Sequence, residues 1–350
     1  MARTPRSGAS LTSITAFHLT PPVSERCDAA GLDSRHHKIV NARTGVIGDT
    51  EMAEYALAIG DRNYSSWSLR AWLLFAKFGI AHDTTRVHLD SPEFLNEIKS
   101  FAPTRTVPAL RLADGTIVWD TLAIAETMAE LNPELPFWPR PALKRALARA
   151  IVAEMHSGFL ALRNDCPMNL RRAYVGFAPS PAVLADVARI ETLWELTGFG
   201  AGTGADSWLF GDFGIADAFF APVVARIVTY GLPVGPAAET YCAKMIADPA
   251  FRRWRAIGLL EDSEHVDCDL PLPERVWPGP APLPAHAVLG AEPVNATCPY
   301  SGDPVAADSL AEIDGQVIGF CNAFCRDKTM IDAAAWPRAM ALVEAARLRG

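Results

Sequence analysis

The stretch Tyr55-Ala-Leu-Ala-Ile-Gly60, followed by the loop Asp61-Arg-Asn-Tyr-Ser-Ser66 and an apolar run over residues 67–78, decides how the chain begins to fold. The first six residues form a short apolar run, which predicts a buried strand. The longer run after the loop is apolar on most sides and ends at Gly79, a residue typical of a helix C-cap. The sequence therefore predicts a strand, a polar loop and a buried helix in succession.

The residues that follow extend this unit to about residue 132. Ser91-Pro92 is a favourable start for a helix, and Asp114-Gly115 is typical of a tight hairpin turn. The patterns predict a strand, a helix, two hairpin strands and a final helix, over residues 82–89, 91–100, 107–112, 116–118 and 121–131. The order βαβ then ββα, with an X-Pro pair before the third strand, looks like the thioredoxin fold, in which a cis proline turns a backbone edge toward a ligand. We therefore expect an α/β thioredoxin-like domain over residues 52–132.

Helical periodicity dominates the next part of the chain. A linker with four prolines spans residues 132–141, and the helical patterns after it indicate an all-α domain over residues 140–268. The clearest predicted helices span residues 143–163, 181–197, 215–230 and 239–246. The proline-rich segment 269–294 is typical of a stiff linker, and we expect a small treble-clef-like module at 295–350.

The first 51 residues show no clear periodicity and are rich in Ser, Thr, Pro, Arg and Gly. Arg3 and Arg6 stand in an opening segment without acidic residues, which faintly resembles a transit peptide. We instead expect a disordered extension over residues 1–51, or a natural start at Met52.

Composition narrows the classes of partner. The net charge of −8 and the lack of a basic stripe argue against a nucleic-acid partner. No apolar run approaches the ~20 residues of a membrane span, so no membrane partner is expected. The seven cysteines are odd in number and mostly scattered, which is typical of a reduced cytoplasmic protein rather than a disulfide scaffold.

Three motifs together resemble the cytosolic glutathione transferase family over about residues 52–265. Tyr64-Ser65-Ser66-Trp67-Ser68-Leu69-Arg70 joins the first strand to the first helix, Thr106-Val107-Pro108-Ala109-Leu110 supplies the proline turn, and Asp120-Thr121 opens the next helix. Their order, spacing and local context agree with that family. The resemblance implies a glutathione-binding thioredoxin-like domain, an all-α transferase domain behind it, and a homodimer with a pocket between the two domains of each chain.

The loop residues suit the chemistry that the resemblance implies. The thiol of glutathione has a reference pKa of about 8.5, so only a few per cent is thiolate at pH 7. A hydroxyl donor at a helix N-terminus favours the anion. By resemblance to serine-type classes, Ser65 is the first candidate for the thiol contact, Ser66 the second and Tyr64 the third. The alternative is that the serines only cap the helix.

The same resemblance assigns the rest of the glutathione site. The backbone of Val107, before Pro108, would pair with the cysteinyl part of glutathione as an added strand does. Thr121 and the N–H groups at the helix start would hold the γ-glutamyl carboxylate, and Asp120 would pair with the amine. The family usually has Glu or Gln before Ser here, so Asp120-Thr121 departs from its pattern.

Two features concern the helical domain. Asp217, three residues after Gly214, resembles the residue with which the family satisfies N–H groups at the start of its buried central helix, a folding role. His156 and Arg163 lie seven residues apart on the first long predicted helix and share a face. They are candidates to bind an acidic substrate or the glycyl carboxylate of glutathione, with ordinary surface polarity as the alternative.

The early serine also resembles the zeta-like transferases, which include maleylacetoacetate isomerase. Their loop has Ser-Ser-Cys-Ser, where this chain has Ser65-Ser66-Trp67-Ser68 and so lacks the cysteine. The resemblance implies a glutathione transferase that acts on an electrophilic small molecule, with glutathione-dependent isomerase activity as an alternative. A non-catalytic glutathione-fold binding protein is the competing class.

The C-terminal module contains Cys298-Pro-Tyr-Ser-Gly302 and Gly319-Phe-Cys-Asn-Ala-Phe-Cys325. This layout resembles small treble-clef metal modules of the YHS/TRASH type. The resemblance implies a zinc site on Cys298, Cys321 and Cys325, with Ser301 at the usual fourth position and Asp303, water or a partner chain left to complete it. The alternatives are a metal-free fold with buried cysteines, and a tail that senses metal or redox state.

Overall fold

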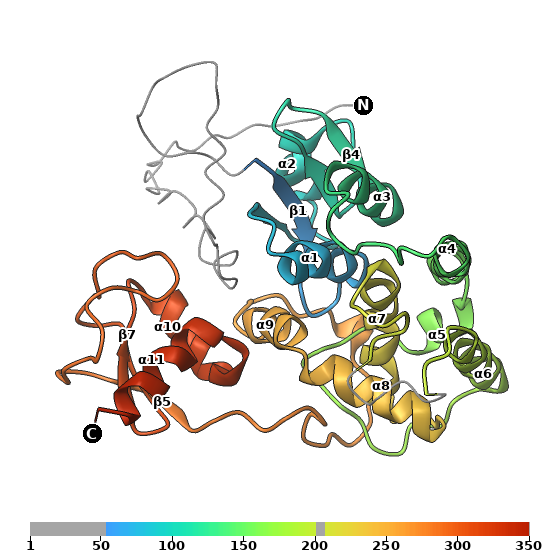
Figure 1. Ribbon diagram of the computed structural model, residues 1–350. Coiled ribbons are helices and arrows are strands. Elements are labelled where there is room, and N and C mark those ends of the chain that lie inside the picture. The colour runs from blue at the N-terminus through green and yellow to red at the C-terminus, as the bar shows by residue number, and fades with distance from the viewer. Residues whose placement is uncertain (1–53, 201–206, 350) are drawn as a thin grey trace, which may run out of the picture.

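An α/β domain, a helical domain and a small C-terminal module follow one another along the chain in a computed structural model, which describes residues 54–200 and 207–349 (Figure 1). The expectations for residues 1–51 lie outside these ranges. Figure 1 shows the C-terminal module set beyond α9, on the side of the helical domain away from α4. No helix among the described residues is both long and apolar enough to cross a bilayer.

A four-stranded sheet in the order β2-β1-β3-β4 forms the α/β domain. Its strands are β1 (Ala56–Gly60), β2 (Asp83–Val87), β3 (Ala109–Arg111) and β4 (Ile117–Trp119). The buried strand β1 pairs parallel with β2 and antiparallel with β3, and β3 pairs antiparallel with β4. The predicted thioredoxin-like order is therefore confirmed.

Helices α1 (Ser66–Phe78) and α3 (Thr121–Leu131) match the predicted helices of this domain closely. Gly79 ends α1 in the left-handed conformation, with φ of 70°, as expected of a glycine C-cap. Both helices pack on the sheet through apolar side chains, and α1 also contacts the helical domain. The start of α1 therefore lies where the two domains meet.

The helix predicted over residues 91–100 is instead a single short turn of α-helix, α2 (Phe94–Glu97), followed by a 3-10 turn (Ile98–Phe101). In a 3-10 turn, residues three apart lie on one face. This geometry buries both Ile98 and Phe101 in the small core on the far side of the sheet.

Six helices form the second domain among the described residues. They are α4 (Ala142–Ser157), α5 (Leu160–Asp165), α6 (Pro181–Leu196), α7 (Ile215–Tyr230), α8 (Pro236–Ala247) and α9 (Pro249–Gly258). Helix α7 is buried along nearly its whole length and contacts α1, α4 and α8 (Figure 1). The all-α character predicted for this part of the chain is confirmed.

The single helix predicted over residues 143–163 is wrong, because the chain breaks between α4 and α5. Gly158 leaves the helical conformation, and Phe159 takes a positive φ of 60°. An added Cβ at Gly158 would lie 2.7 Å from the Glu154 carbonyl oxygen. The break lets Phe159 bury in the core, although both pieces keep helical spacing and periodicity alone does not show the turn.

The proline-rich segment lies against the helical domain rather than running free of it. The backbone N–H of Arg275 donates to Ala173 O, and that of Val175 donates to Pro273 O, both at 2.8 Å. A short 3-10 turn (Val266–Cys268) precedes the segment. The predicted linker over residues 269–294 extends too far, because Ala285–Val288 within it already form a strand of the C-terminal module.

The C-terminal module has its own antiparallel sheet, in the order β5-β6-β7. Its elements are β5 (Ala285–Val288), β6 (Leu310–Ile313), β7 (Gln316–Gly319), α10 (Ala323–Ile331), a 3-10 turn (Ala333–Ala335) and α11 (Pro337–Arg347). The buried Phe320 and Trp336 belong to its core, which also takes in Ile257 of α9. The module is therefore packed onto the helical domain.

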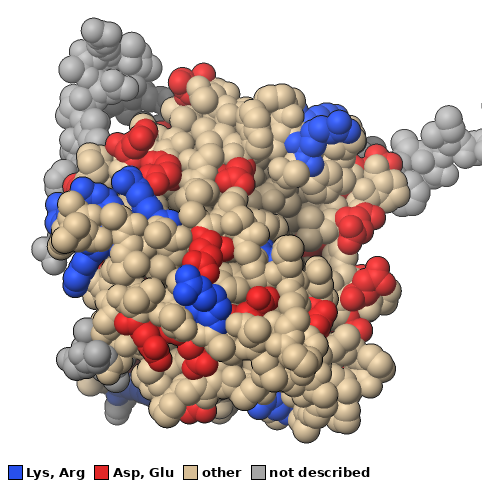
Figure 2. Space-filling view, turned by 90° about the vertical axis from the view of Figure 1, so that its right-hand side faces the viewer, with Lys and Arg blue, Asp and Glu red and all other residues tan. Residues whose placement is uncertain are grey.

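The surface carries both signs of charge. Figure 2 shows the face that points to the right in Figure 1. Acidic and basic side chains are interspersed on this face, and they form no continuous basic area there.

Candidate functional site

An open cavity of about 390 Å³ lies between the start of α1, the proline turn before β3 and the start of α3. It is lined by Trp67, Thr106, Val107, Pro108, Trp119, Asp120 and Thr121. The bond between Val107 and Pro108 is cis. The structure therefore brings together in one cavity all four residues that the sequence assigns to glutathione binding.

The start of α3 presents polar groups to this cavity. Asp120 caps the helix by accepting from Leu122 N at 2.8 Å and Ala123 N at 3.3 Å, and its side chain remains 47% exposed. Thr121 is buried, and its Oγ1 has no hydrogen-bond partner among the described residues. Since a buried polar atom without a partner is costly, it marks a place where a ligand would complete the bond. A carboxylate beside a hydroxyl that has no partner among these residues fits a ligand with both an amine and a carboxylate.

The three hydroxyl candidates lie beside the cavity and not in its lining. Ser65 is the N-cap of α1: its Oγ accepts from Ser68 N at 3.3 Å and donates to Ser68 Oγ at 2.7 Å. The Oγ of Ser66 accepts from Arg226 Nη2 of α7 at 3.0 Å. The hydroxyl of Ser65 must rotate to meet a sulfur, whereas the bond from Arg226 leaves the hydroxyl hydrogen of Ser66 available to donate.

Tyr64 packs against the segment that follows α9. Its ring meets the imidazole of His265 edge-on, with centroids 4.6 Å apart, and burial raises the pKa of its phenol. His265 Nε2 lies 2.9 Å from the buried Asp61 carboxylate, and Trp254 Nε1 donates to Arg62 O at 2.8 Å. The loop before α1 is thus held in place by contacts with α9 and with the residues that follow α9.

Sequence reasoning missed two buried arginines beside this loop, Arg70 of α1 and Arg226 of α7. Arg70 is fully buried, and none of its three guanidinium nitrogens has a hydrogen-bond partner among the described residues. Its Cζ lies 4.4 Å from the ring centre of Trp67 and 5.2 Å from that of Phe219. Burial, and then the charges of Arg163 and Arg226, lower the pKa of Arg70. A cation on a mostly apolar helix is the sequence signal that marks both residues, although α1 also contains Lys77 near its end.

His156 and Arg163 both approach Trp67, but not as one helix face. His156 Nε2 lies 3.1 Å from Asp120 Oδ2, which joins α4 to the start of α3, and burial lowers the pKa of the imidazole. Arg163 Nε donates to Gly158 O at 2.8 Å, and its Cζ lies 5.0 Å from the Trp67 ring centre. The shared helix face predicted for the pair is therefore wrong, since α4 ends before α5 begins.

Asp217 forms the contacts expected for its folding role. Its Oδ2 accepts from Gly214 N at 3.0 Å, and its Oδ1 accepts from Leu209 N at 3.1 Å and from Tyr241 Oη at 3.0 Å. The carboxyl is fully buried, and burial raises the pKa of Asp217 to about 6. These three bonds tie the start of α7 to the preceding loop and to α8.

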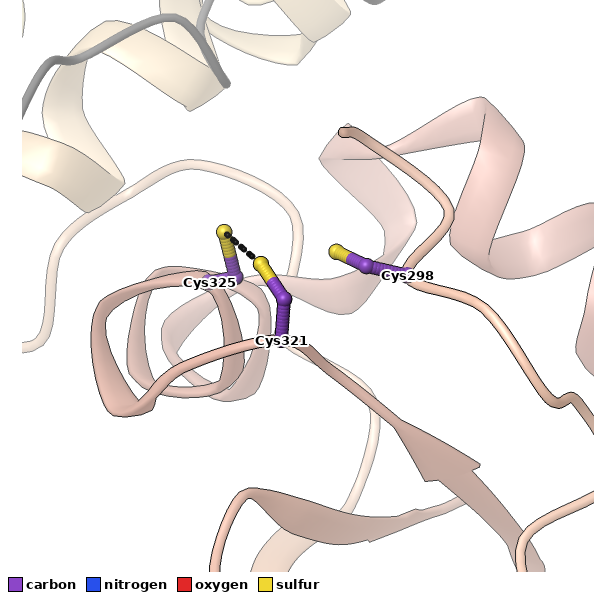
Figure 3. A group of neighbouring side chains, drawn as sticks. All are labelled: Cys298, Cys321 and Cys325. Carbon is purple, nitrogen blue, oxygen red and sulfur yellow. Dashed lines mark hydrogen bonds between the residues drawn. The ribbon is translucent and has the colours of Figure 1, made fainter. Parts of the chain in front are cut away.

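The three cysteines predicted as metal ligands converge in the C-terminal module (Figure 3). The Sγ atoms of Cys298, Cys321 and Cys325 all lie within 4.8 Å of one another. None of the described cysteines forms a disulfide. The neighbouring Cys325 thiol lowers the pKa of Cys298 to about 4. Ser301 Oγ donates to Cys321 Sγ at 3.3 Å, and the carboxylate of Asp303 is not part of the group.

Known proteins resemble part of this chain. The family described as "Glutathione S-transferase, N-terminal domain" matches residues 64–131. A probable maleylacetoacetate isomerase from Caenorhabditis elegans is 33% identical over 103 residues, which cover 29% of this chain and 47% of that protein. The maleylacetoacetate isomerase of Dictyostelium discoideum is 30% identical over 118 residues, covering 33% and 52%. The chain thus spans about half the length of these relatives.

Solved structures also align with it. A glutathione transferase homologue from Burkholderia, crystallised with bound glutathione, is 24% identical, with a TM-score of 0.46 and coverage of 59% of this chain and 98% of that one. A glutathione S-transferase from Rhodospirillum rubrum is 22% identical, with a TM-score of 0.44 and coverage of 63% and 96%. Residues 64–131 of this chain are therefore similar to the glutathione S-transferase N-terminal domain.

Proposed function

We propose that this protein binds glutathione in the cavity at the start of α1 and α3 and activates its thiol for attack on an electrophilic small molecule. The observation that carries the proposal is the cavity itself. It joins Val107, Pro108, Asp120 and Thr121, and the buried threonine hydroxyl has no hydrogen-bond partner within the described part of the chain. The match of the same segment to the transferase N-terminal domain supports it.

Each residue of the cavity would bind the part of glutathione that suits its chemistry. The backbone of Val107 pairs with the cysteinyl unit, Thr121 Oγ1 donates to a carboxylate, and Asp120 accepts from the amine. The sulfur then lies toward the start of α1, where the helix dipole and a hydroxyl from Ser65 or Ser66 favour the thiolate. Lowering the thiol pKa by two units requires about 2.7 kcal/mol of preferential stabilisation of the anion. A charge-assisted donor and a helix terminus together supply energies of this size.

The second substrate we propose is an acidic electrophile. Three arginines lie around Trp67 and Ser66, namely Arg70, Arg163 and Arg226. Burial is the main cause that lowers the pKa of each of them. The charges of neighbouring arginines also lower the pKa values of Arg70 and Arg226, and a carboxylate near these guanidinium groups would offset that repulsion. The relatives named maleylacetoacetate isomerase favour, as a second candidate, glutathione-dependent isomerisation of an acidic ketone.

We propose a homodimer located in the cytoplasm. For the C-terminal module we propose that Cys298, Cys321 and Cys325 hold a zinc ion, supported by the convergence of their thiols.

Alanine variants at the two serines test the proposal. We expect Ser65→Ala or Ser66→Ala to leave the Kd for glutathione nearly unchanged while lowering kcat by about 10²-fold, because only the thiolate loses a donor. Thr121→Val should instead weaken glutathione binding by about tenfold or more, through the loss of one hydrogen bond to a charged group. Kd by titration calorimetry and kcat with maleylacetoacetate and with a chlorodinitrobenzene separate the two effects.

Ser180→Ala is the matched control, since Ser180 caps α6 as Ser65 caps α1, accepting from Val183 N at 3.3 Å. Each cap removal should cost about 1 kcal/mol of stability, so a kcat loss shared by both variants reflects folding alone. Normal kcat in both Ser65→Ala and Ser66→Ala would move the thiol contact to Tyr64. No glutathione binding by the unmodified chain at millimolar concentration would overturn the proposal.

A further inference from the structure

The cysteine cluster of the C-terminal module is built from three separate elements. Cys298 lies in the loop before β6, Cys321 follows β7, and Cys325 lies in the first turn of α10. Figure 3 shows their sulfur atoms directed toward a common point. The Sγ atoms of Cys321 and Cys325 are 3.9 Å apart. A tetrahedral zinc ion with bonds of ~2.3 Å holds its ligand sulfurs ~3.8 Å apart, so these positions fit three corners of such a site.

The fourth corner has no metal-binding side chain from the described residues. Ser301 Oγ lies beside the cluster, where it donates to Cys321 Sγ and accepts from Asp303 N at 3.2 Å. Ser301 is therefore a hydrogen-bond partner of the ligand Cys321 and not a ligand itself. The ligand group contains no histidine or carboxylate. Structural zinc sites close with four protein ligands, whereas three protein ligands leave a position for an exchangeable one.

The open side faces solvent. Cys298 and Cys325 are buried, Cys321 is partly exposed, and residues 301–304 next to it are exposed. Small molecules therefore reach the cluster from the Ser301 side.

Charge balance also suits this ion. Three thiolates and a divalent cation leave one negative charge. Lys328, one turn along α10 from Cys325, is fully buried, with its Nζ 4.6 Å from the Tyr300 ring centre and 4.5 Å from that of Trp336. A buried ammonium offsets that single negative charge. A monovalent cation bound by the same three thiolates would leave two negative charges.

From these observations we infer that the C-terminal module is an open three-thiolate zinc site whose fourth position takes an external thiol as a thiolate. The inference rests on the proposed zinc site of the module and is independent of the cavity at α1. Binding replaces water by sulfur at the metal, and the proton of the incoming thiol passes to solvent, because a coordinated thiol is deprotonated. Glutathione and other small thiols share the chemistry that this position selects.

Cobalt(II) in place of zinc, in the reduced full-length protein, tests the inference by absorption spectroscopy. One cobalt per chain should show sulfur-to-metal charge transfer from three thiolates, and added glutathione or mercaptoethanol should increase that band by about one third. S-methylglutathione, which has no thiol, is the matched ligand and should leave the band unchanged. Cys321→Ser should abolish the three-thiolate spectrum, whereas Cys268→Ser, at a partly exposed cysteine outside the cluster, should keep it.

The outcomes separate the two proposals. If neither cobalt nor zinc is retained, the zinc site itself is wrong and this inference fails with it. A retained metal whose spectrum ignores every thiol shows a closed site and overturns the inference alone. A change caused equally by S-methylglutathione also contradicts it, because the response then comes from the cavity at α1 and not from a fourth sulfur.

Discussion

At the scale of single residues, Arg70 is a buried cation that packs against Trp67 at the site. Its guanidinium is fully buried, has no hydrogen-bond acceptor among residues 54–200 and 207–349 for its N–H groups, and lies against Trp67, which lines the cavity. An unpaired buried charge is destabilising, so a functional reason is needed for its presence.

Arg70→Met should therefore raise the free energy of unfolding, by about 1–3 kcal/mol, because an apolar chain of similar length replaces an unpaired charge. If the substrate is acidic, the ratio of kcat/KM for an acidic over a neutral electrophile should fall by about tenfold. Denaturant unfolding and paired kinetics measure the two effects.

Arg226→Met is the matched control, because that guanidinium donates to Cys166 O, Pro222 O and Ser66 Oγ. Its loss should destabilise the protein, since buried acceptors are left unpaired. If Arg70→Met destabilises as much, Arg70 has a compensating partner and the argument for an anionic ligand fails.

The sequence predicts which residues meet at the cavity better than it predicts what they contact. The motif around Val107 and Asp120 specifies backbone positions, and the fold places them at one edge. The bond between Ser66 and Arg226 and the contact between Asp120 and His156 join different domains. Local pattern carries no information about such long-range pairs.

At the scale of elements, the start of α7 depends on one buried carboxyl. Asp217 accepts three hydrogen bonds, and burial raises its pKa to about 6. A carboxyl whose pKa is raised by folding binds its proton more tightly in the folded state. Its contribution to stability is complete below the unfolded pKa of about 3.9 and is lost as the pH rises through about 6.

The difference in unfolding free energy between the unmodified protein and Asp217→Asn should consequently shrink between about pH 4 and 6. The expected slope is roughly 1 kcal/mol per pH unit, with little change above that range. Denaturant titrations of both proteins across this range give the difference directly. A difference that stays constant or grows with pH would contradict the assignment.

The sequence predicts helix ends well where a capping residue marks them. It does not predict where a helix breaks in the middle. Gly79 ends α1 where a glycine C-cap is expected, and Asp120 starts α3. The break at Gly158 and Phe159 follows from core packing, because Phe159 turns inward, and no proline announces it. The 3-10 turn at Ile98–Phe101 likewise follows from the need to bury two side chains at once.

At the scale of the whole molecule, α9 connects the C-terminal module to the loop before α1. Arg252 donates through two nitrogens to the carboxylate of Asp332, and Ile257 enters the core of the module. On its other side, Asn63 Nδ2 donates to Gly258 O at the end of α9. The sequence predicts the linker and the module but not this packing, because prolines indicate stiffness and not what the chain lies against.

We propose above that the chain binds glutathione and activates its thiol. Ultraviolet difference absorbance of the thiolate, followed from pH 5 to 9 with the full-length protein saturated with glutathione, tests it most directly. We expect a bound thiol whose apparent pKa lies about two units below the free value of about 8.5. A bound thiol that titrates at the free value would indicate a carrier without catalysis, and a lack of binding at millimolar glutathione would contradict the claim altogether.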